Sequence, residues 1–409
     1  MSNQHTTRFS LIALAVAGLG LAAAPAQAVD WGGYFRAGPQ STKKDASRAC
    51  YGLNGPGLKY RLGNECDIYG EFALSQALKT ENGAEYKAVL MTNFGRGGID
   101  VDGSSLNDKM GMNQMYVEGK GMDFAPNTTF WAGKRWYGRA DVHIVDTFFV
   151  DMTGVGAGAT TIPVGTNGTK AGIAYFRADQ DSTAAGAAVQ PGHRINLEMY
   201  DIPVNPDGKL RVLGTATKGN FTGGKDGYGL TLQHDQKNIT PLGNGTNTVW
   251  LQYAQGSTGL NANFGDMTKT SAKKGYRLVE SFTWQKGVFG GQALALWQED
   301  KDVGGVKVTS MSVGGRASYG ITQNFKMVAE AGYSQKKPDG GSTAKLAKFT
   351  LAPTISAGPA FSSRPELRLY VTTAKWNGAA ATDGGVPSTG AFAGKTTGTS
   401  YGVQVETWF

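Results

Sequence analysis

The chain ends on Ser400-Tyr401-Gly402-Val403-Gln404-Val405-Glu406-Thr407-Trp408-Phe409, a stretch whose two-residue period decides the fold class. Every second residue from Tyr401 onward is apolar or threonine, and the residues between them are polar or small except for Trp408. Successive side chains of a β-strand point to opposite faces, so this stretch predicts a strand with one apolar and one polar face. If Phe409 lies on the apolar face, Trp408 lies on the polar one.

The same period recurs in segments of about ten residues, the length that a tilted strand needs to cross a bilayer. Apolar and polar residues alternate at 67–72, 194–199, 325–331 and 367–372, with the charged residues of each segment on one face. Turn sequences such as Asn205-Pro206-Asp207-Gly208 separate these segments. The pattern therefore predicts a series of strands joined by turns.

A soluble β-sandwich would alternate in the same way, but single cores stop growing near roughly 250–300 residues, and no linker divides these 409 residues. Four Gly-, Ser- and Thr-rich stretches are predicted to be extracellular loops: 98–108, 154–171, 255–275 and 377–398. At about 21 to 24 residues for each strand and its connection, the length allows sixteen or eighteen strands. We predict an all-β fold, a closed transmembrane antiparallel β-barrel wide enough to hold an aqueous channel.

The beginning of the chain indicates export. A polar start with Arg8 precedes an apolar run at 9–24 and then Ala26-Gln27-Ala28, the features of a signal peptide and its cleavage site. We expect residues 1–28 to be the signal peptide and residues 29–409 to be one barrel domain. The net charge of +8 is spread along the chain rather than gathered in Lys/Arg blocks, so nucleic acid is not an expected partner.

The two cysteines, Cys50 and Cys66, are predicted to form a disulfide, because an exported chain reaches an oxidising compartment. Metal ligation is the competing interpretation. The three histidines after residue 28 are His143, His193 and His234, far apart and away from the cysteines. We therefore expect no metal and no cofactor.

The chain resembles the maltoporin family from end to end, more weakly at about 160–340. The stretches that carry the resemblance are Val29-Asp30-Trp31-Gly32-Gly33-Tyr34-Phe35-Arg36, residues 59–66, Trp131-Ala132-Gly133-Lys134-Arg135, Asp141-Val142-His143, residues 151–158, Ser363-Arg364-Pro365, Ala374-Lys375-Trp376 and Glu406-Thr407-Trp408-Phe409.

The resemblance implies an eighteen-stranded homotrimer in the outer membrane of a Gram-negative bacterium, embedded in its lipid, whose third loop folds inward and constricts the pore. Sugars in this family slide over a line of aromatic residues, while charged residues exchange hydrogen bonds with their hydroxyls. The chemistry is reasonable, because a pyranose ring has an apolar face for aromatic planes and a rim of hydroxyls that needs donors and acceptors.

Residue by residue, the resemblance assigns the aromatic slide to Tyr34, Tyr69 and Trp408. It assigns the charged track to Arg36, Arg61, Glu71, Arg139 and Asp146, and it places Arg139, Asp141, His143 and Asp146 on the inward-folded loop. Two structural alternatives stay open: the aromatics could belong to interfacial girdles, and the charged residues could form ion pairs that only stiffen the loop.

Departures from the family pattern bear on the substrate. Phe148 stands where the family has a constriction tyrosine. It is expected to offer the sugar the same aromatic plane but not the hydroxyl of a tyrosine. Asn113 replaces an arginine of the track, Leu230 replaces a slide aromatic, and another slide position falls at about Ser310 or Met311. No tryptophan occurs between Gly95 and Met112. We expect a shortened or weakened slide.

The function that follows is passive diffusion of sugars, of the maltose and maltodextrin type or related to them. The alternative is a general or anion-preferring diffusion porin without a specific sugar site, which the missing aromatics would favour. An enzyme housed in a barrel would need a nucleophile activated by a base, and no recognisable motif offers one, so no enzymatic activity is expected.

Overall fold

The computed structural model describes residues 29–43, 49–78, 83–97, 110–180, 190–239 and 244–409. The predicted signal peptide and the predicted loop at 98–108 lie outside these residues. None of the helical segments in the described part of the chain has the length and hydropathy needed to cross a membrane.

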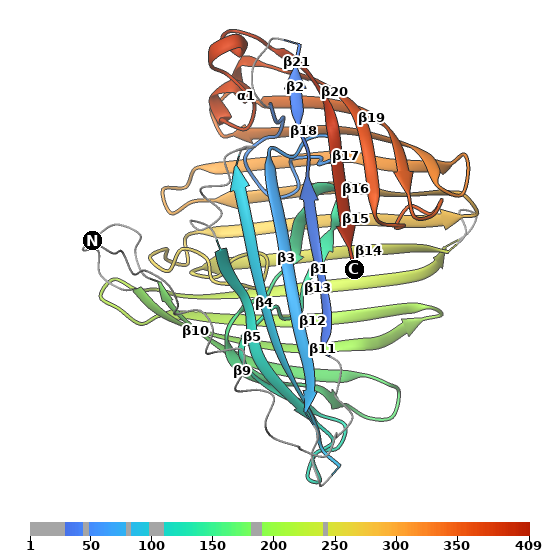
Figure 1. Ribbon diagram of the computed structural model, residues 1–409. Coiled ribbons are helices and arrows are strands. Elements are labelled where there is room, and N and C mark those ends of the chain that lie inside the picture. The colour runs from blue at the N-terminus through green and yellow to red at the C-terminus, as the bar shows by residue number, and fades with distance from the viewer. Residues whose placement is uncertain (1–28, 44–48, 79–82, 98–109, 181–189, 240–243) are drawn as a thin grey trace, which may run out of the picture.

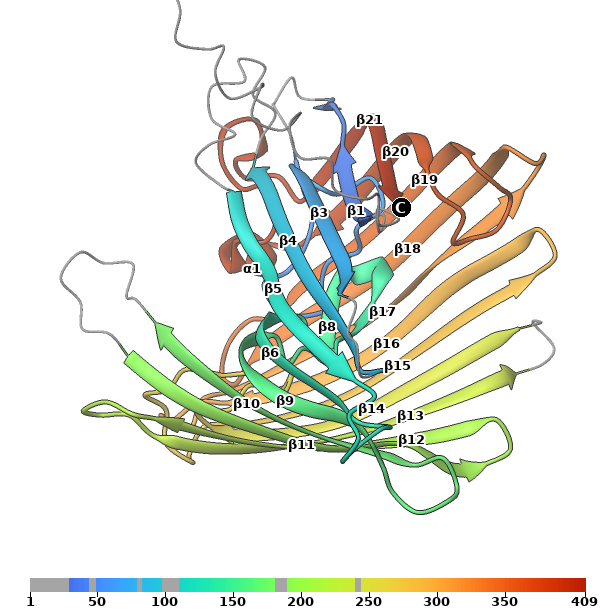
Figure 2. The ribbon, with the colours of Figure 1, turned by 60° about the horizontal axis from the view of Figure 1, so that its bottom comes forward.

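The described strands form one closed antiparallel barrel (Figures 1 and 2). Its sheet has 19 strands, one of which, β2 (Gln40–Thr42), is a short stretch alongside β21. The other eighteen make up the ring: β1 (Asp30–Ala37), β3 (Asp67–Leu78), β4 (Glu85–Gly97), β5 (Met110–Lys120), β6 (Thr129–Arg135), β9 (Gly154–Pro163), β10 (Lys170–Gln180), β11 (Gln190–Asn205), β12 (Gly208–Gly219), β13 (Asp226–Ile239), β14 (Gly245–Gly256), β15 (Lys274–Lys286), β16 (Phe289–Lys301), β17 (Lys307–Gly320), β18 (Phe325–Pro338), β19 (Ala344–Ser356), β20 (Glu366–Trp376) and β21 (Thr397–Trp408). The predicted eighteen-stranded barrel is confirmed.

The ring closes where β1 pairs with both β3 and β21. Gly33 and Phe409 exchange two backbone hydrogen bonds, of 3.0 and 3.1 Å, and the ring of Phe409 lies 4.8 Å from that of Trp31. A Cβ on Gly33 would lie 2.3 Å from the carbonyl oxygen of Glu71. The closure therefore needs a glycine at this position.

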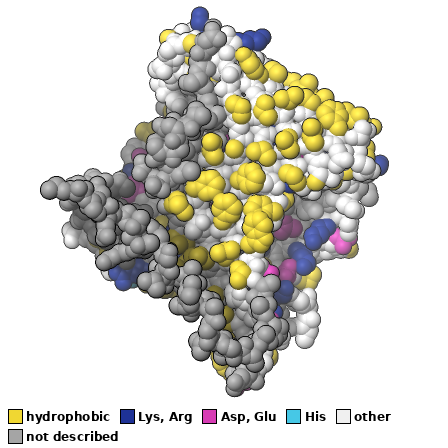
Figure 3. All heavy atoms as spheres, viewed as in Figure 1, with side chains coloured by type: hydrophobic (Ala, Val, Ile, Leu, Met, Phe, Trp, Pro, Cys, Tyr) yellow, Lys and Arg dark blue, Asp and Glu magenta, His cyan; other side chains and the backbone are white. Residues whose placement is uncertain are grey.

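The predicted alternation separates an apolar outer wall from a polar interior. On β20, Leu367, Leu369 and Val371 are half-exposed on the outside, whereas Arg368 and Thr372 are buried inside. Figure 3 shows hydrophobic side chains spread over the outer wall around β1 and β3, with few charged side chains among them. This is the arrangement expected of a wall in lipid around a polar lumen.

The prediction of an extracellular loop at 154–171 is wrong, because Gly154–Pro163 is the barrel strand β9, paired with β6 and β10. Its glycines serve packing. A Cβ on Gly154 or Gly156 would lie 2.9 or 3.0 Å from the Phe176 ring, and one on Gly158 would lie 2.9 Å from Trp131 Nε1. The glycine column leaves room for large aromatics on the inner face of the wall. By contrast, most of 255–275 and 377–398 lies between strands, as predicted.

A first inner segment, residues 49–66, packs inside the barrel against β16 to β21. Tyr51, Leu58, Tyr60 and Leu62 are buried, and the ring of Tyr60 fills the space left on the inner wall by glycines such as Gly332, whose Cβ would lie 2.0 Å from that ring. The segment is therefore anchored to the wall by large apolar side chains.

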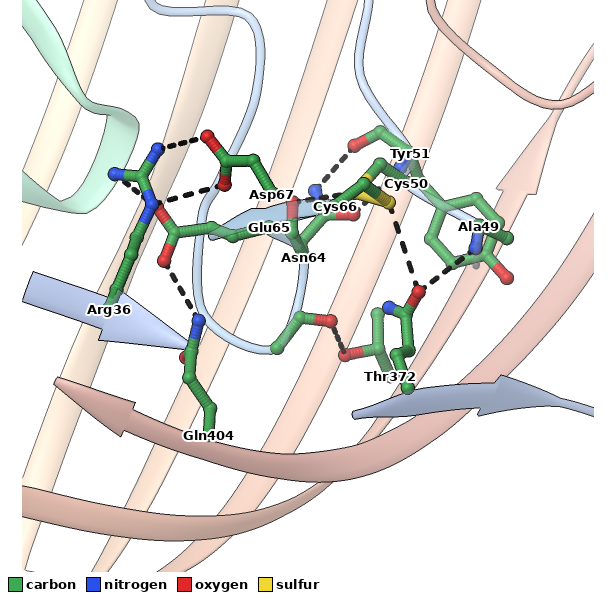
Figure 4. Close-up of a disulfide and its surroundings, with 12 residues drawn as sticks. Arg36, Ala49, Cys50, Tyr51, Asn64, Glu65, Cys66, Asp67, Thr372 and Gln404 are labelled. Atoms are coloured by element: carbon green, nitrogen blue, oxygen red, sulfur yellow. Dashed lines mark hydrogen bonds and ion pairs between the residues drawn. A yellow bond between two sulfur atoms is a disulfide. The ribbon is translucent and has the colours of Figure 1, made fainter. Parts of the chain in front are cut away.

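The predicted disulfide between Cys50 and Cys66 is confirmed, and it joins the two ends of the first inner segment (Figure 4). Asn64 adds a second link: its side chain accepts from Tyr51 N and donates to Tyr51 O and Tyr60 O, each at 2.7 Å. The segment is thus tied internally as well as to the wall.

A second inner segment, residues 136–153, crosses the interior and includes β7 (Ala140–Val142), a 3-10 helix η2 (His143–Val145) and β8 (Thr147–Val150). The far wall holds it: Gln252 and Arg277 donate to the carbonyl oxygen of Phe149 at 2.8 and 3.1 Å. Arg61 N donates to Ile144 O at 3.0 Å, which joins the two inner segments.

Replacing both cysteines by serine, C50S/C66S, should lower the free energy of unfolding by about 3 kcal/mol, the value for a cross-link closing a loop of ~15 residues. Denaturant titration of the detergent-solubilised protein measures this, with the reduced wild type as the control. An unchanged midpoint would mean that apolar packing alone anchors the first inner segment.

Candidate functional site

All nine residues that the sequence assigned to substrate binding line one cavity of about 490 Å³, here called the constriction chamber. They are Tyr34, Arg36, Arg61, Tyr69, Glu71, Arg139, Asp146, Phe148 and Trp408, joined by Asp67, Trp136, Asp141 and His143. Residues more than 300 positions apart in the chain meet here because the barrel closes between β1 and β21. The nine residues thus lie around one cavity, and their roles in binding sugar are still predictions.

One wall of the chamber is aromatic. Tyr34, Tyr69 and Trp408 come from the neighbouring strands β1, β3 and β21, with Tyr34 and Trp408 directly opposite each other. The Tyr34 and Tyr69 rings lie 6.2 Å apart. The period of two residues turns all three side chains to the lumen, so they are not part of an outer girdle.

Two arginines of the chamber are fully engaged in ion pairs. Arg36 lies 3.0 Å from Glu65, 2.8 Å from Asp67 and 3.2 Å from Asp146.

Arg61 lies 2.7 Å from Glu65 and 3.1 Å from Glu406, and it donates to Tyr34 Oη at 2.6 Å. This network joins the first inner segment to the strands of the closure. It also fixes Tyr34.

The carboxylates of the chamber differ in how they are paired. Burial opposes ionisation of Asp146, but Arg61 and Arg36 outweigh it and hold the pKa of its carboxyl below the usual value. Glu71 accepts from Tyr69 Oη and, at 3.3 Å, from Asn113 Nδ2. Asn113, where the resemblance led us to expect a track arginine, thus donates to Glu71.

His143 lines the chamber beside Trp408. Burial, reinforced by Arg61, holds the pKa of its imidazole well below the usual value, so the ring is neutral at physiological pH. It meets the Trp408 ring edge-on at 5.6 Å, while the guanidinium carbon of Arg364 lies 4.2 Å from the centre of that ring. His143 and Arg364 together hold Trp408 in place.

Sequence reasoning missed Trp136, Arg364 and Phe361. The guanidinium carbon of Arg139 lies 3.9 Å from the centre of the Trp136 ring and 3.6 Å from that of Phe148. Arg364 lies in the Ser363-Arg364-Pro365 stretch that carried the family resemblance, so that motif could have indicated it. Trp136 directly follows another such stretch, residues 131–135, but it lies in a loop, where no two-residue period indicates the direction of a side chain.

Leu230, which the resemblance placed where the family has a slide aromatic, does not face the lumen. Leu230 is half-exposed on the outer wall, and its neighbour Thr231 faces the lumen. Of the two positions considered on β17, Met311 is likewise outside and Ser310 inside. A displacement of one residue exchanges the faces of a strand, and this weakly matching region gave no register. The stretch between Gly95 and Met112, which contains no tryptophan, lies largely outside the described residues.

Three more cavities share lining residues with the constriction chamber: one, beside β11 to β13, shares Trp136 and Arg139, and the other two continue the chamber along the lumen. An outer chamber at the end with the long loops shares Arg61, Asp146 and Phe148 with it. An exit chamber at the end with the short turns shares His143 and Trp408 with it and is also lined by Phe361. The three chambers thus follow one another, with the predicted residues in the middle.

The chain is similar to known proteins in sequence and, more distantly, in structure. A family model described as LamB porin matches residues 29–409. A maltoporin of Hahella chejuensis is 30% identical over 434 aligned positions, which cover 100% of this chain and 99% of that protein. Among solved structures, an anion-selective porin from Comamonas acidovorans aligns over 93% of this chain and 99% of its own, at 12% identity and a TM-score of 0.47. OmpT of Vibrio cholerae aligns over 93% and 97%, at 8% identity and a TM-score of 0.44. Because the family model spans the whole barrel, the chain belongs to the LamB porin family.

Proposed function

We propose that this outer-membrane porin conducts maltose- and maltodextrin-type sugars through the constriction chamber, with Tyr34, Tyr69 and Trp408 as the surface over which they slide. One observation carries the proposal: three aromatic side chains from neighbouring strands form one wall of the chamber, and hydrogen-bonding groups form the others. A sugar in this space has an aromatic surface for its apolar face and polar partners for its hydroxyls.

The three chambers suit passage rather than retention. A channel must bind its solute well enough to admit it and weakly enough to release it, which several shallow sites in series achieve. Phe148 marks the step from the outer chamber, and Trp408 marks the step to the exit chamber. We propose that sugars pass from one chamber to the next in this order, without any chemical change.

The charges of the chamber argue against the anion-preferring alternative. The lining of the chamber carries more carboxylates than guanidinium groups: Asp67, Glu71, Asp141 and Asp146 against Arg36, Arg61 and Arg139. Arg36 and Arg61 are also paired directly with carboxylates within 3.4 Å. Paired charges produce little net field, whereas anion selection needs an uncompensated positive one. The arrangement therefore favours neutral solutes.

Single-channel conductance in a planar bilayer tests the proposal. Titration with maltose, maltotriose, sucrose and glucose should close the ion current in a concentration-dependent way, most effectively with maltotriose, which covers more of the aromatic wall than the smaller sugars. Open channels that no sugar affects would instead support the general diffusion porin.

Trp408→Ala should weaken the maltotriose block about tenfold, equivalent to about 1.4 kcal/mol, because it removes the aromatic plane that leads to the exit chamber. Tyr401→Ala is the matched control, since Tyr401 lies on the same strand and faces outward. Equal affinities for Trp408→Ala and the wild type would remove Trp408 from the slide.

We further propose that the protein assembles as a homotrimer embedded in lipid, as its resemblance to the family implies. The apolar outer wall supports contact with lipid. Native mass spectrometry from detergent should give the mass of three barrels, and heating should convert it to that of one. A single-barrel mass before heating would contradict the trimer.

A further inference from the structure

The three arginines of the constriction chamber differ in the availability of their donors. Arg36 and Arg61 are each surrounded by carboxylates, as described above. Within the described residues, Arg139 donates no hydrogen bond, and the one carboxylate oxygen within 4.0 Å of it is Asp151 Oδ1, at 4.0 Å from Nε. The terminal nitrogens of Arg139 can therefore donate to a solute without first breaking an ion pair.

Aromatic stacking holds Arg139 instead. Its guanidinium carbon lies 3.9 Å from the centre of the Trp136 ring and 3.6 Å from that of Phe148, so two aromatic rings lie against this one group. Stacking uses the faces of a guanidinium, whereas its hydrogen bonds are made in its plane. The Nε atom is buried without a partner, which leaves the terminal nitrogens as the donors toward the chamber.

The same contact changes the role expected of Phe148. The Arg139 guanidinium lies against one face of the Phe148 ring, so a sugar in the constriction chamber does not find that face free. Asp141, two residues after Arg139 and also lining the chamber, offers a carboxylate acceptor close by. This wall therefore offers a donor and an acceptor beside the Phe148 ring.

We propose that Trp136 and Phe148 are positioning residues that hold the Arg139 guanidinium by stacking, so that Arg139 donates to neighbouring hydroxyls of a sugar in the constriction. The inference rests on the proposed function and goes beyond it, because Phe148 acts through Arg139 and not as a sugar platform. The solutes selected are those that present two adjacent hydroxyls, which a planar guanidinium can bind with two parallel N–H groups.

A double-mutant cycle on the full-length porin tests this, with the maltotriose concentration that half-blocks the current as the readout. Phe148→Leu and Arg139→Gln should each weaken the block about tenfold, and Phe148→Leu should add less than about twofold when Arg139 is already Gln, because residues that act together are not additive. Phe148→Tyr keeps the stacking ring and should bind maltotriose with the wild-type affinity.

Two further variants keep the test decisive if Phe148→Leu folds poorly. Arg139→Lys preserves the charge but not the planar group, and it should lose as much affinity as Arg139→Gln. Trp136→Leu should behave as Phe148→Leu does. The control is Phe72→Leu, on the outer wall of β3, and each block is normalised to the sugar-free conductance of the same variant.

The outcomes separate the two proposals. If maltotriose blocks the wild type and Phe148→Leu keeps its full effect in the Arg139→Gln background, Phe148 contacts the sugar directly and the positioning role is wrong. Full activity of Arg139→Lys would also overturn it. If no sugar blocks the wild type, the proposed function fails first and this inference with it.

Discussion

Closure of the barrel is the constraint on which the rest of the structure depends. Lipid offers no partners for backbone N–H and C=O groups, so a spanning sheet must pair every edge. Here the last edge is satisfied by β1 and β21, with Gly33 and Phe409 joined by two backbone hydrogen bonds. The same closure brings Tyr34 and Trp408 opposite each other. One set of hydrogen bonds thus both completes the wall in the membrane and assembles the aromatic side of the constriction chamber.

A ring of this circumference encloses more space than its own side chains fill, and the two inner segments occupy it. Residues 49–66 depend on large apolar groups, on the disulfide and on Asn64. Residues 136–153 depend on donors from the opposite wall, such as Gln252 and Arg277. The two modes of anchoring differ because the first segment packs closely on a wall hollowed by glycines, whereas the second crosses the lumen and must satisfy its backbone carbonyls there.

The three arginines of the chamber make different contacts: two stabilise the loops and one keeps free donors. Arg36 and Arg61 use their donors on carboxylates and hold the loops to the strands. Arg139 is held by rings instead, which leaves its in-plane donors available. Trp408 is supported by His143 and Arg364, so its ring stays at the passage to the exit chamber. An ion pair occupies the in-plane donors of an arginine, whereas an aromatic stack lies against its faces and leaves those donors unoccupied.

The sequence alone determined what depends on local period and on motif: the barrel class, the apolar outer face of each strand and the lumenal position of Tyr69 and Trp408, because side-chain direction in a strand alternates whatever its neighbours are. The pairing of Cys50 with Cys66 followed from their being the two cysteines of an exported chain. Tertiary structure decided the rest. The direction of the Leu230 side chain depends on the register of its strand, which the sequence did not show. Residues 154–163 form a strand whose glycines leave room for Phe176 and Trp131 of the two neighbouring strands. The stack of Trp136, Arg139 and Phe148 was not predictable, because loops have no period and the contacts that shape this one come from strands more than a hundred residues away.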